Sequence, residues 1–345
     1  MATIASTSVV ALDAVKNIRE DLGNVIFNVT PFMTPFTSGI SQARATADTH
    51  EWLTDTYADA VDTNAAIEAV APDGPTAGST RVRLGNFIQI ADKTVTVTKK
   101  AEFMDRAGVP GKEMAYQLMK LGKELQMDVE KQTLGCYGAV ATKSQGESNA
   151  AGVSGAFGSY IGTNQTVNGA TNAAINAGVG GLGVLFNGST VPTVGDNNPA
   201  ISQTSMDSLL DGVWDNSGDI NSAKIMASAG VVSSLRNTLS GMATNADAVV
   251  SNLDANTTNG GNIIARVAVY VSQFGPIAVV PNKHMPANTL YVVDYSTWGL
   301  AFAGGKKIHT TDIATQTSAE QKLLECYYTL EARSEAGNAA YYNIA

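Results

Sequence analysis

Charged side chains are scarce in this chain. Only 15% of its 345 residues are Asp, Glu, Lys or Arg, which is below the average for soluble globular proteins. The 22 basic residues are outnumbered by 31 acidic ones and form no basic run, so sequence-specific binding of nucleic acid is not expected. A low charge suits a protein that covers much of its surface with subunit contacts.

Cysteines and long apolar runs are also few. The two cysteines, Cys136 and Cys326, fit a reducing cytoplasm, and we expect buried thiols rather than a disulfide. The N-terminal stretch has no basic region and Asp13 interrupts its apolar residues, so no secretion signal is predicted. The longest uncharged run, from Ser148 to Gly195, is too rich in Gly, Asn and Thr to span a bilayer.

Constellations that carry chemistry are missing as well. Gly178 to Gly183 match the spacing of a dinucleotide fingerprint, but no strand pattern precedes them and no helix pattern follows. His50-Glu51 resembles the start of a zinc-protease helix, yet Thr54 stands where the second histidine is required. The histidines lie far apart without ligands at metal spacing: His50, His284 and His309. We therefore predict no catalytic, cofactor or metal site, and no enzyme.

What the chain does have is an aromatic arm between Asn28 and Tyr57. Prolines after Thr30 and Thr34 push those threonines into extended geometry, so the segment cannot be one helix. It nevertheless carries large aromatics at Phe32, Phe36, Trp52 and Tyr57. Such an arm is either a strap that packs on a neighbouring subunit or a loop buried within its own domain.

Periodic patterns follow the arm. Alternating apolar residues between Ser79 and Phe103 predict two antiparallel strands that form a ribbon. A helix is predicted from Pro110 to Gly135, either in a coiled coil or lying along a sheet. Its apolar stripe consists of Met114, Leu118, Leu121, Leu125 and Val129. Its polar positions include Lys112, Lys120, Lys123 and Lys131. A shorter helix is expected from Ala11 to Asn28.

The rest of the chain reads as mixed helix and strand. Ser144 to Pro199 is predicted to be a loop-rich insertion with a short amphipathic piece around 156–161. After Met206 the pattern predicts helices near 209–214 and 231–239, and strands at 224–227, 263–271, 277–280 and 290–293. The fold class is therefore α+β.

Several motifs along the chain carry a family resemblance. They are the arm that ends in His50-Glu51-Trp52-Leu53-Thr54-Asp55, Phe274-Gly275-Pro276, the Tyr291-Val292-Val293-Asp294 strand and Tyr328-Thr329-Leu330-Glu331-Ala332-Arg333. Their order, with the long helix between them, resembles a major head protein family of tailed phages that has the Hong Kong 97-type capsid fold.

The resemblance implies an N-terminal arm over 1–75 and an extended β-hairpin loop over 76–104. A peripheral domain with a long spine helix follows over 105–205, then an axial domain over 206–300, and 301–345 return to the peripheral domain. It also implies a major capsid protein that assembles as pentamers and hexamers into the icosahedral head around the double-stranded DNA genome of a tailed phage. The alternatives are an encapsulin-like shell of a bacterial nanocompartment and a soluble enzyme with an unrecognised site.

The expected partners are other copies of the chain, a portal protein, and scaffolding or decoration proteins. Because the arm motif begins by Asn28, any scaffold is expected to be a separate protein. Packaged DNA is expected to lie near the shell only non-specifically, and an acidic wall would not trap it. No membrane partner is expected. The protein would be part of the virion, assembled in the host cytoplasm.

The residues expected to contact neighbouring subunits belong to the arm and the ribbon: Phe32, Phe36, Trp52, Tyr57, Arg81, Arg83, Lys93 and Lys99. Some members of the capsid superfamily join a lysine of the extended loop to an asparagine of a neighbour through an isopeptide bond. Here Lys93, Lys99 and Lys100 have no acid in a defined sequence context to accept the lysine proton. We therefore expect a shell that is held together non-covalently.

Overall fold

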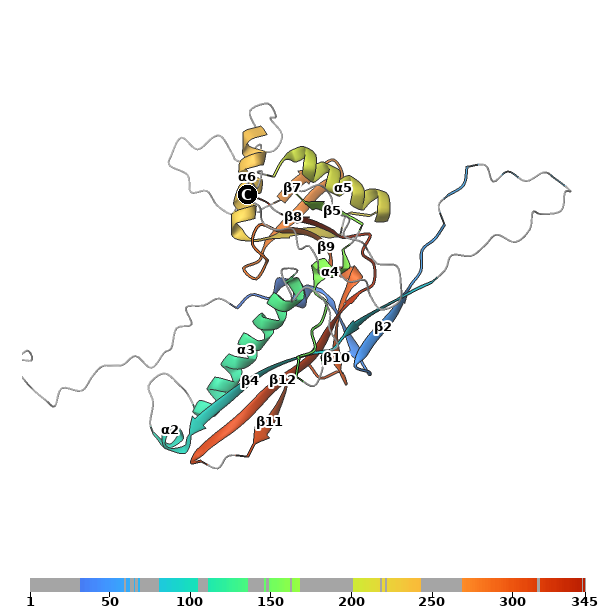
Figure 1. Ribbon diagram of the computed structural model, residues 1–345. Helices are drawn as coiled ribbons and strands as arrows, with labels where there is room; N and C mark the ends of the chain where they lie inside the picture. Colours follow the sequence, from blue (N-terminus) through green and yellow to red (C-terminus); the bar gives the residue numbers. More distant parts are fainter. Residues whose placement is uncertain are drawn as a thin grey trace, which may run out of the picture.

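Two β-sheets and a separate two-stranded ribbon form the framework of the molecule (Figure 1). The computed structural model describes residues 32–58, 60–62, 65, 68, 81–104, 111–135, 146, 149–161, 163–167, 201–217, 219–220, 222–242, 269–314, 317–342 and 344. Helices and strands are mixed, as the sequence predicts. The helix expected from Ala11 to Asn28 lies outside the described residues.

The five-stranded sheet is built around β12 (Ala319–Ala332), the longest strand of the described chain. β4 (Gln89–Thr98) pairs with β12 along its whole length, while β10 (Trp298–Ala303) and β11 (His309–Ile313) pair with successive halves of β12. β1 (Ser41–Ala45) adds a parallel edge beside β10. In β4 the buried residues alternate with exposed ones, which is the period of a half-buried strand.

The long helix α3 (Glu113–Leu134) packs on this sheet, with the short α2 (Lys99–Phe103) near its N-terminal end (Figure 1). Met114, Leu125 and Val129 are buried, and Leu118 and Leu121 pack against the same core. The predicted apolar stripe is therefore confirmed, and the helix lies along a sheet. Pro110 lies outside the described residues.

The six-stranded sheet has the order β5 (Gln165–Val167), β13 (Ala339–Tyr342), β9 (Leu290–Asp294), β6 (Ala223–Ala227), β8 (Gly275–Pro281) and β7 (Val269–Ser272). The helices α5 (Gln203–Ser217) and α6 (Ala229–Met242) accompany it. Four successive residues of β9, from Leu290 to Val293, are buried, as expected for a strand covered on both faces. Except for 263–268, which lie outside the described residues, the elements predicted after Met206 are present.

Two predicted domain boundaries differ from the pairing of the strands. The prediction puts 206–300 in an axial domain and 301–345 in the peripheral domain. In the structure β10 already begins at Trp298 in the five-stranded sheet, and β13 returns to the six-stranded sheet beside β9. The C-terminal segment thus joins both lobes, because its last strand fills the place between β5 and β9.

The extended hairpin is also in a different place from the predicted one. β3 (Val82–Phe87) does not pair with β4; it pairs with β2 (Thr49–Thr54), in register from Thr49↔Phe87 to Thr54↔Val82. β4 pairs instead with β12. The prediction of a ribbon from two strands within 76–104 is therefore wrong. The first strand of the observed ribbon, β2, lies in the segment predicted to be the arm.

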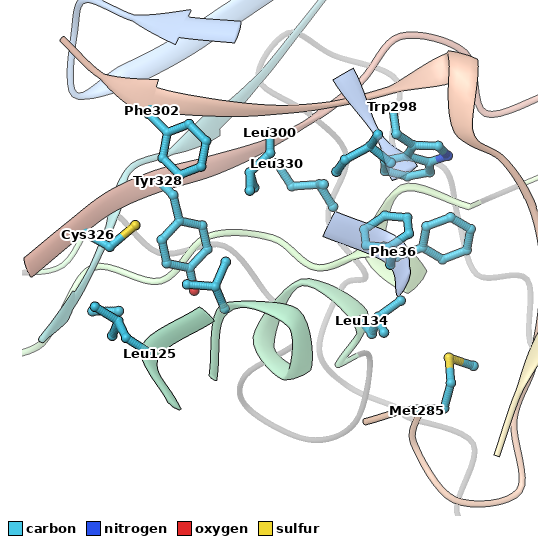
Figure 2. Close-up of a cluster of buried hydrophobic side chains, with 14 of the residues drawn as sticks. Phe36, Leu125, Leu134, Met285, Trp298, Leu300, Phe302, Cys326, Tyr328 and Leu330 are labelled. Atoms are coloured by element: carbon cyan, nitrogen blue, oxygen red, sulfur yellow. The ribbon is translucent and has the colours of Figure 1, made fainter. Parts of the chain in front are cut away.

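The insertion supplies part of the core between the two sheets. The helical turn α4 (Phe157–Tyr160) buries Phe157 against Trp298 and Tyr291, at ring-centroid distances of 4.4 and 4.5 Å. Phe36 lies edge-on to Phe157 at 5.8 Å. Figure 2 shows Phe36 between Trp298 and Leu134 of α3. The short amphipathic piece predicted around 156–161 is thus confirmed as this buried turn, and 168–199 lie outside the described residues.

Candidate functional site

Asn86 fixes the root of the β2–β3 ribbon to the body of the molecule. Its fully buried side chain donates through Nδ2 to the carbonyl oxygen of Leu330 (2.8 Å) and to Ser154 Oγ (3.0 Å). Its Oδ1 accepts from the backbone N–H of Gly155 at 2.8 Å. One amide therefore joins β3, β12 and the segment before α4, and a buried amide with these partners satisfies both its donor and its acceptor.

Trp52 forms a second anchor on the neighbouring strand. Its Nε1 donates to the carbonyl oxygen of Ala332 at 2.6 Å, and its ring lies 6.1 Å from that of Tyr160. The Tyr160 hydroxyl in turn donates to the carbonyl oxygen of Gly85 at 3.2 Å, and burial raises the pKa of this hydroxyl. Both strands of the ribbon are thus held at their root by side chains of the same subunit.

The Glu331 carboxylate also lies at the root. His50 Nε2 is 3.6 Å from it, and the carboxylate accepts from Arg333 Nε at 3.2 Å. The pKa of Glu331 is lowered, first by the nearby His50 and then by Arg333, and burial only partly opposes this. The carboxylate therefore stays ionised between two basic side chains at the point where the ribbon leaves the body.

The opposite face of the ribbon is open. Glu51 and Arg83 pair across the two strands, Asp55 and Arg81 pair at 3.5 Å, and Leu53 between them is 65% exposed. Successive side chains of a strand point to opposite faces, so these five residues share one face while Trp52 and Asn86 lie on the other. The ribbon thus has one face packed on its own subunit and one charge-balanced face turned outward.

The structure corrects the prediction for Phe36. Its ring is fully buried among aromatic residues of its own chain, so it has no surface for a neighbouring subunit. It also lies in the short helix α1 (Pro35–Gly39), where Pro35 starts the first turn, rather than in extended chain. Trp52 is also packed against its own core. The alternative of a loop buried within its own domain applies to this part of the arm.

The other arm and ribbon residues are accessible. Phe32 is 44% exposed and Tyr57 fully exposed, and both stay predicted contacts with a neighbour. Arg81 and Arg83 lie on the open ribbon face. Lys99 is exposed, but on α2 beside the five-stranded sheet and not on the ribbon.

Lys93 has acidic partners that the sequence did not reveal. Its Nζ lies 2.9 Å from Asp128 and 3.5 Å from Glu124, both on α3. Burial lowers the pKa of Lys93, but these two carboxylates outweigh it and the net shift is upward. The expectation that no acid accompanies this lysine is wrong, because the acids come from a helix some thirty residues away. The ammonium is held charged in an ion pair within the subunit.

Glu130 is a functional residue that the sequence pattern does not mark. Its fully buried carboxylate accepts from the backbone N–H groups of Phe36 (2.9 Å) and Thr37 (2.8 Å) and from Asn282 Nδ2 (2.7 Å). It therefore caps α1 and ties the arm and the loop after β8 to α3. No local signal indicates this role, since its partners lie more than 90 residues away in the sequence.

The described residues also form a cavity and leave some apolar side chains exposed. A cavity of about 300 Å³ lies between α1, α3 and β10, lined among others by Thr37, Gln126 and Lys307. Within the described ranges, no three His, Cys, Asp or Glu side chains gather as a metal site would require, and no helix is long and apolar enough to cross a membrane. Phe103, Met104 and Met119 are exposed on and beside α2 and α3.

The sequence matches a protein-family model, and the structure resembles known capsid structures. The family model of the SU10 major capsid protein matches residues 3–345. A search of curated protein sequences found no match. Among solved structures, the chain is similar to the capsid of cyanophage A-1(L), with a TM-score of 0.63 and 12% identity over 97% of this chain and 99% of that one. It is also similar to the capsid of a native GTA particle, with a TM-score of 0.57 and 12% identity over 99% and 100% of the two chains.

Proposed function

The chain belongs to the SU10 major capsid protein family, and from this premise we propose that it assembles as pentamers and hexamers into the icosahedral head around the double-stranded DNA of a tailed phage. It is a major capsid protein of a tailed phage and part of the virion, and its role is structural. Assembly takes place in the host cytoplasm. The nanocompartment alternative is not adopted, because the family model that covers the chain is that of a capsid protein.

The open face of the β2–β3 ribbon carries this proposal. A two-stranded ribbon alone is marginally stable in water, and this one packs on its own subunit only at its root. On its opposite face it presents Leu53, with Arg83 and Glu51 beside it, to the outside. A neighbouring copy of the chain would cover Leu53 and reinforce the two strands.

The contacts of each ribbon are individually weak, because exposed ion pairs contribute about 0–1 kcal/mol. In a closed shell every subunit gives one ribbon and receives another, so many weak contacts form together and dissociation requires breaking them together. Besides other copies of the chain, the proposed partners are a portal protein at one vertex and separate scaffolding and decoration proteins.

Leu53→Asp tests the role of the ribbon. We expect the variant to fold with an unchanged far-ultraviolet circular dichroism spectrum, since Leu53 is exposed, but to give few or no shells in electron micrographs where the wild-type protein gives many. Thr96→Asp is the matched control, because Thr96 is exposed on β4 outside the ribbon. Normal shells from Leu53→Asp would refute the ribbon's role, and a wild-type protein that stays monomeric at high concentration would refute the assembly itself.

A further inference from the structure

The outward face of α3 carries four exposed lysines. At 100° per residue, the four exposed lysines of the helix fall within an arc of about 100°, centred roughly opposite the buried stripe. They are Lys112, Lys120, Lys123 and Lys131. Two glutamates fall within the same arc, but Glu113 is half-buried and Glu130 is fully buried. Figure 1 shows β4 and β12 along one side of α3, which is the side of the buried stripe. This cationic face stands out in a chain with a net charge of −9.

The acidic residues of α3 within and beside this face have partners in their own subunit. Glu124 and Asp128 pair with Lys93 of β4, and Glu113 accepts a hydrogen bond from Gln117 at 2.6 Å. Of the four lysines, Lys120 alone has a described ion pair, a 4.0 Å contact with Glu124. On the other flank of the arc the exposed residues are neutral, including Met119 and Gln126. Lys112, Lys123 and Lys131 are thus exposed on this face, whereas the acidic side chains of the helix are partly or fully buried.

We propose that the outward face of α3 is a contact surface for double-stranded DNA. The inference rests on the proposed function, which puts such DNA inside the shell, and on charge complementarity. Lys112 and Lys120 are about 12 Å apart along the helix, as are Lys123 and Lys131, so they reach separate phosphates of a backbone that carries one charge per about 1.7 Å of duplex axis. Lysine ammonium groups bind phosphates as point charges and read no base sequence.

The expected affinity is low for one subunit. Contacts with three or four phosphates lie in the range of non-specific binding, with dissociation constants of about 10⁻⁴–10⁻⁶ M at physiological salt. Repetition of the face over a shell lets packed DNA touch many subunits at once while each contact is readily exchanged. The acidic remainder of the chain limits the attraction to this face.

Binding of a fluorescein-labelled duplex of about 20 base pairs to the full-length unassembled protein tests the inference, by fluorescence anisotropy between about 25 and 200 mM NaCl. We expect K112Q/K123Q/K131Q to bind at least tenfold more weakly at the lowest salt, and the slope of log K against log[salt] to fall by about 2.7. The control K99Q/K100Q/K283Q removes the same charge from exposed lysines outside the face and should keep wild-type affinity.

Three outcomes would overturn the inference: no duplex binding by the wild-type protein at the lowest salt, unchanged binding by the α3 variant, or equal loss in both variants, which would indicate net charge rather than this face. Electron microscopy of the same preparations separates this test from that of the proposed function. Shells that form without any effect of the α3 lysines on DNA binding would refute the DNA surface alone, whereas absence of shells in the wild-type protein would refute the assembly.

Discussion

At the scale of single residues, buried polar groups hold the arm and the ribbon in place. Glu130 and Asn86 each join segments that are distant in the sequence, although Asn86 Oδ1 also accepts from the backbone N–H of its neighbour Phe87. When a buried acceptor is removed, each donor that it served stays buried without a hydrogen bond, and this lowers the stability of the fold by the desolvation penalty of that donor. These two residues are therefore more sensitive to substitution than many larger apolar ones.

Glu130→Ala is expected to lower the free energy of unfolding of the unassembled subunit by about 3–5 kcal/mol, because the N–H groups of Phe36 and Thr37 and the Asn282 amide lose their acceptor. Urea denaturation followed by circular dichroism measures this loss. Glu113→Ala, on the same helix but only half-buried, should cost less than about 1 kcal/mol. Similar losses from the two variants would contradict the capping role.

Glu331 should contribute to a loss of stability in acid. Its pKa is lower in the folded than in the unfolded chain, where a glutamate titrates near about 4.3, so its contribution is present above that pH and disappears as the pH falls through the folded pKa. Glu331→Gln should therefore flatten the decline of the urea midpoint below about pH 4.3. If the variant keeps the full wild-type decline, the contacts of Glu331 with His50 and Arg333 do not cause it.

At the scale of elements, the long helix shows what local periodicity predicts well. Its apolar stripe and its exposed lysines are both where the spacing of residues puts them, because one helix face meets one sheet. Strand partners are different. β4 pairs with β12 more than 200 residues later, and β3 pairs with a strand read as arm. Alternation of apolar and polar residues predicts a strand but does not identify the strand it pairs with. Because sequential strands usually pair, β3 and β4 are wrongly predicted to form a hairpin.

Leu125→Ala tests the assigned face of the helix. Leu125, on the buried face of α3, is 1% exposed, and its truncation should destabilise the subunit by about 2–5 kcal/mol through lost burial and the cavity left behind. Lys123→Ala, two positions away on the exposed face, should change stability by less than about 0.5 kcal/mol. The comparison is made by chemical denaturation, and equal effects would show that the face is assigned incorrectly.

The arm can be tested as an element by truncation. Because Phe36, Ile40 and Ala45 are buried in the core, deletion of residues 1–45 should abolish cooperative unfolding rather than leave a folded body. Deletion of 1–31 is the control, since it removes none of these three residues. Thermal unfolding followed by circular dichroism distinguishes the two, and a cooperative transition in the longer deletion would mean that the arm is dispensable for folding.

At the scale of the whole molecule, the two lobes share one continuous framework. β10 and β12 belong to the five-stranded sheet, while β13, a few residues later, completes the six-stranded sheet. Phe157, Trp298 and Tyr291 fill the junction. A two-lobed α+β fold could be predicted from the pattern and the family resemblance, but the junction could not, because the amphipathic piece around 156–161 does not reveal that Phe157 packs on Tyr291 and Trp298, more than 100 residues later.

The assembled shell is expected to remain free of covalent cross-links. The ribbon with its connection, residues 49–87, contains no lysine, and Lys93 is held by two carboxylates of its own subunit. Among the asparagines near the C-terminus, Asn338 is fully buried and hydrogen-bonded to Trp298 and Thr297. Particles boiled in detergent should give one band near 35.8 kDa. A ladder of larger bands that persists under reducing conditions would contradict this expectation.

The pairing of β4 with β12 has a mechanical consequence. Its register runs without interruption from Ala319↔Thr98 to Tyr328↔Gln89. The hydrogen bonds of an antiparallel pair lie across the strands, so tension applied along their length loads the bonds in shear, all at once, rather than opening them one after another. Outward pressure on a shell stretches its wall in the plane of the subunits. A wall whose strands lie along that stretch would yield by elastic strain shared over a whole strand, and would fail only when the entire ladder slides.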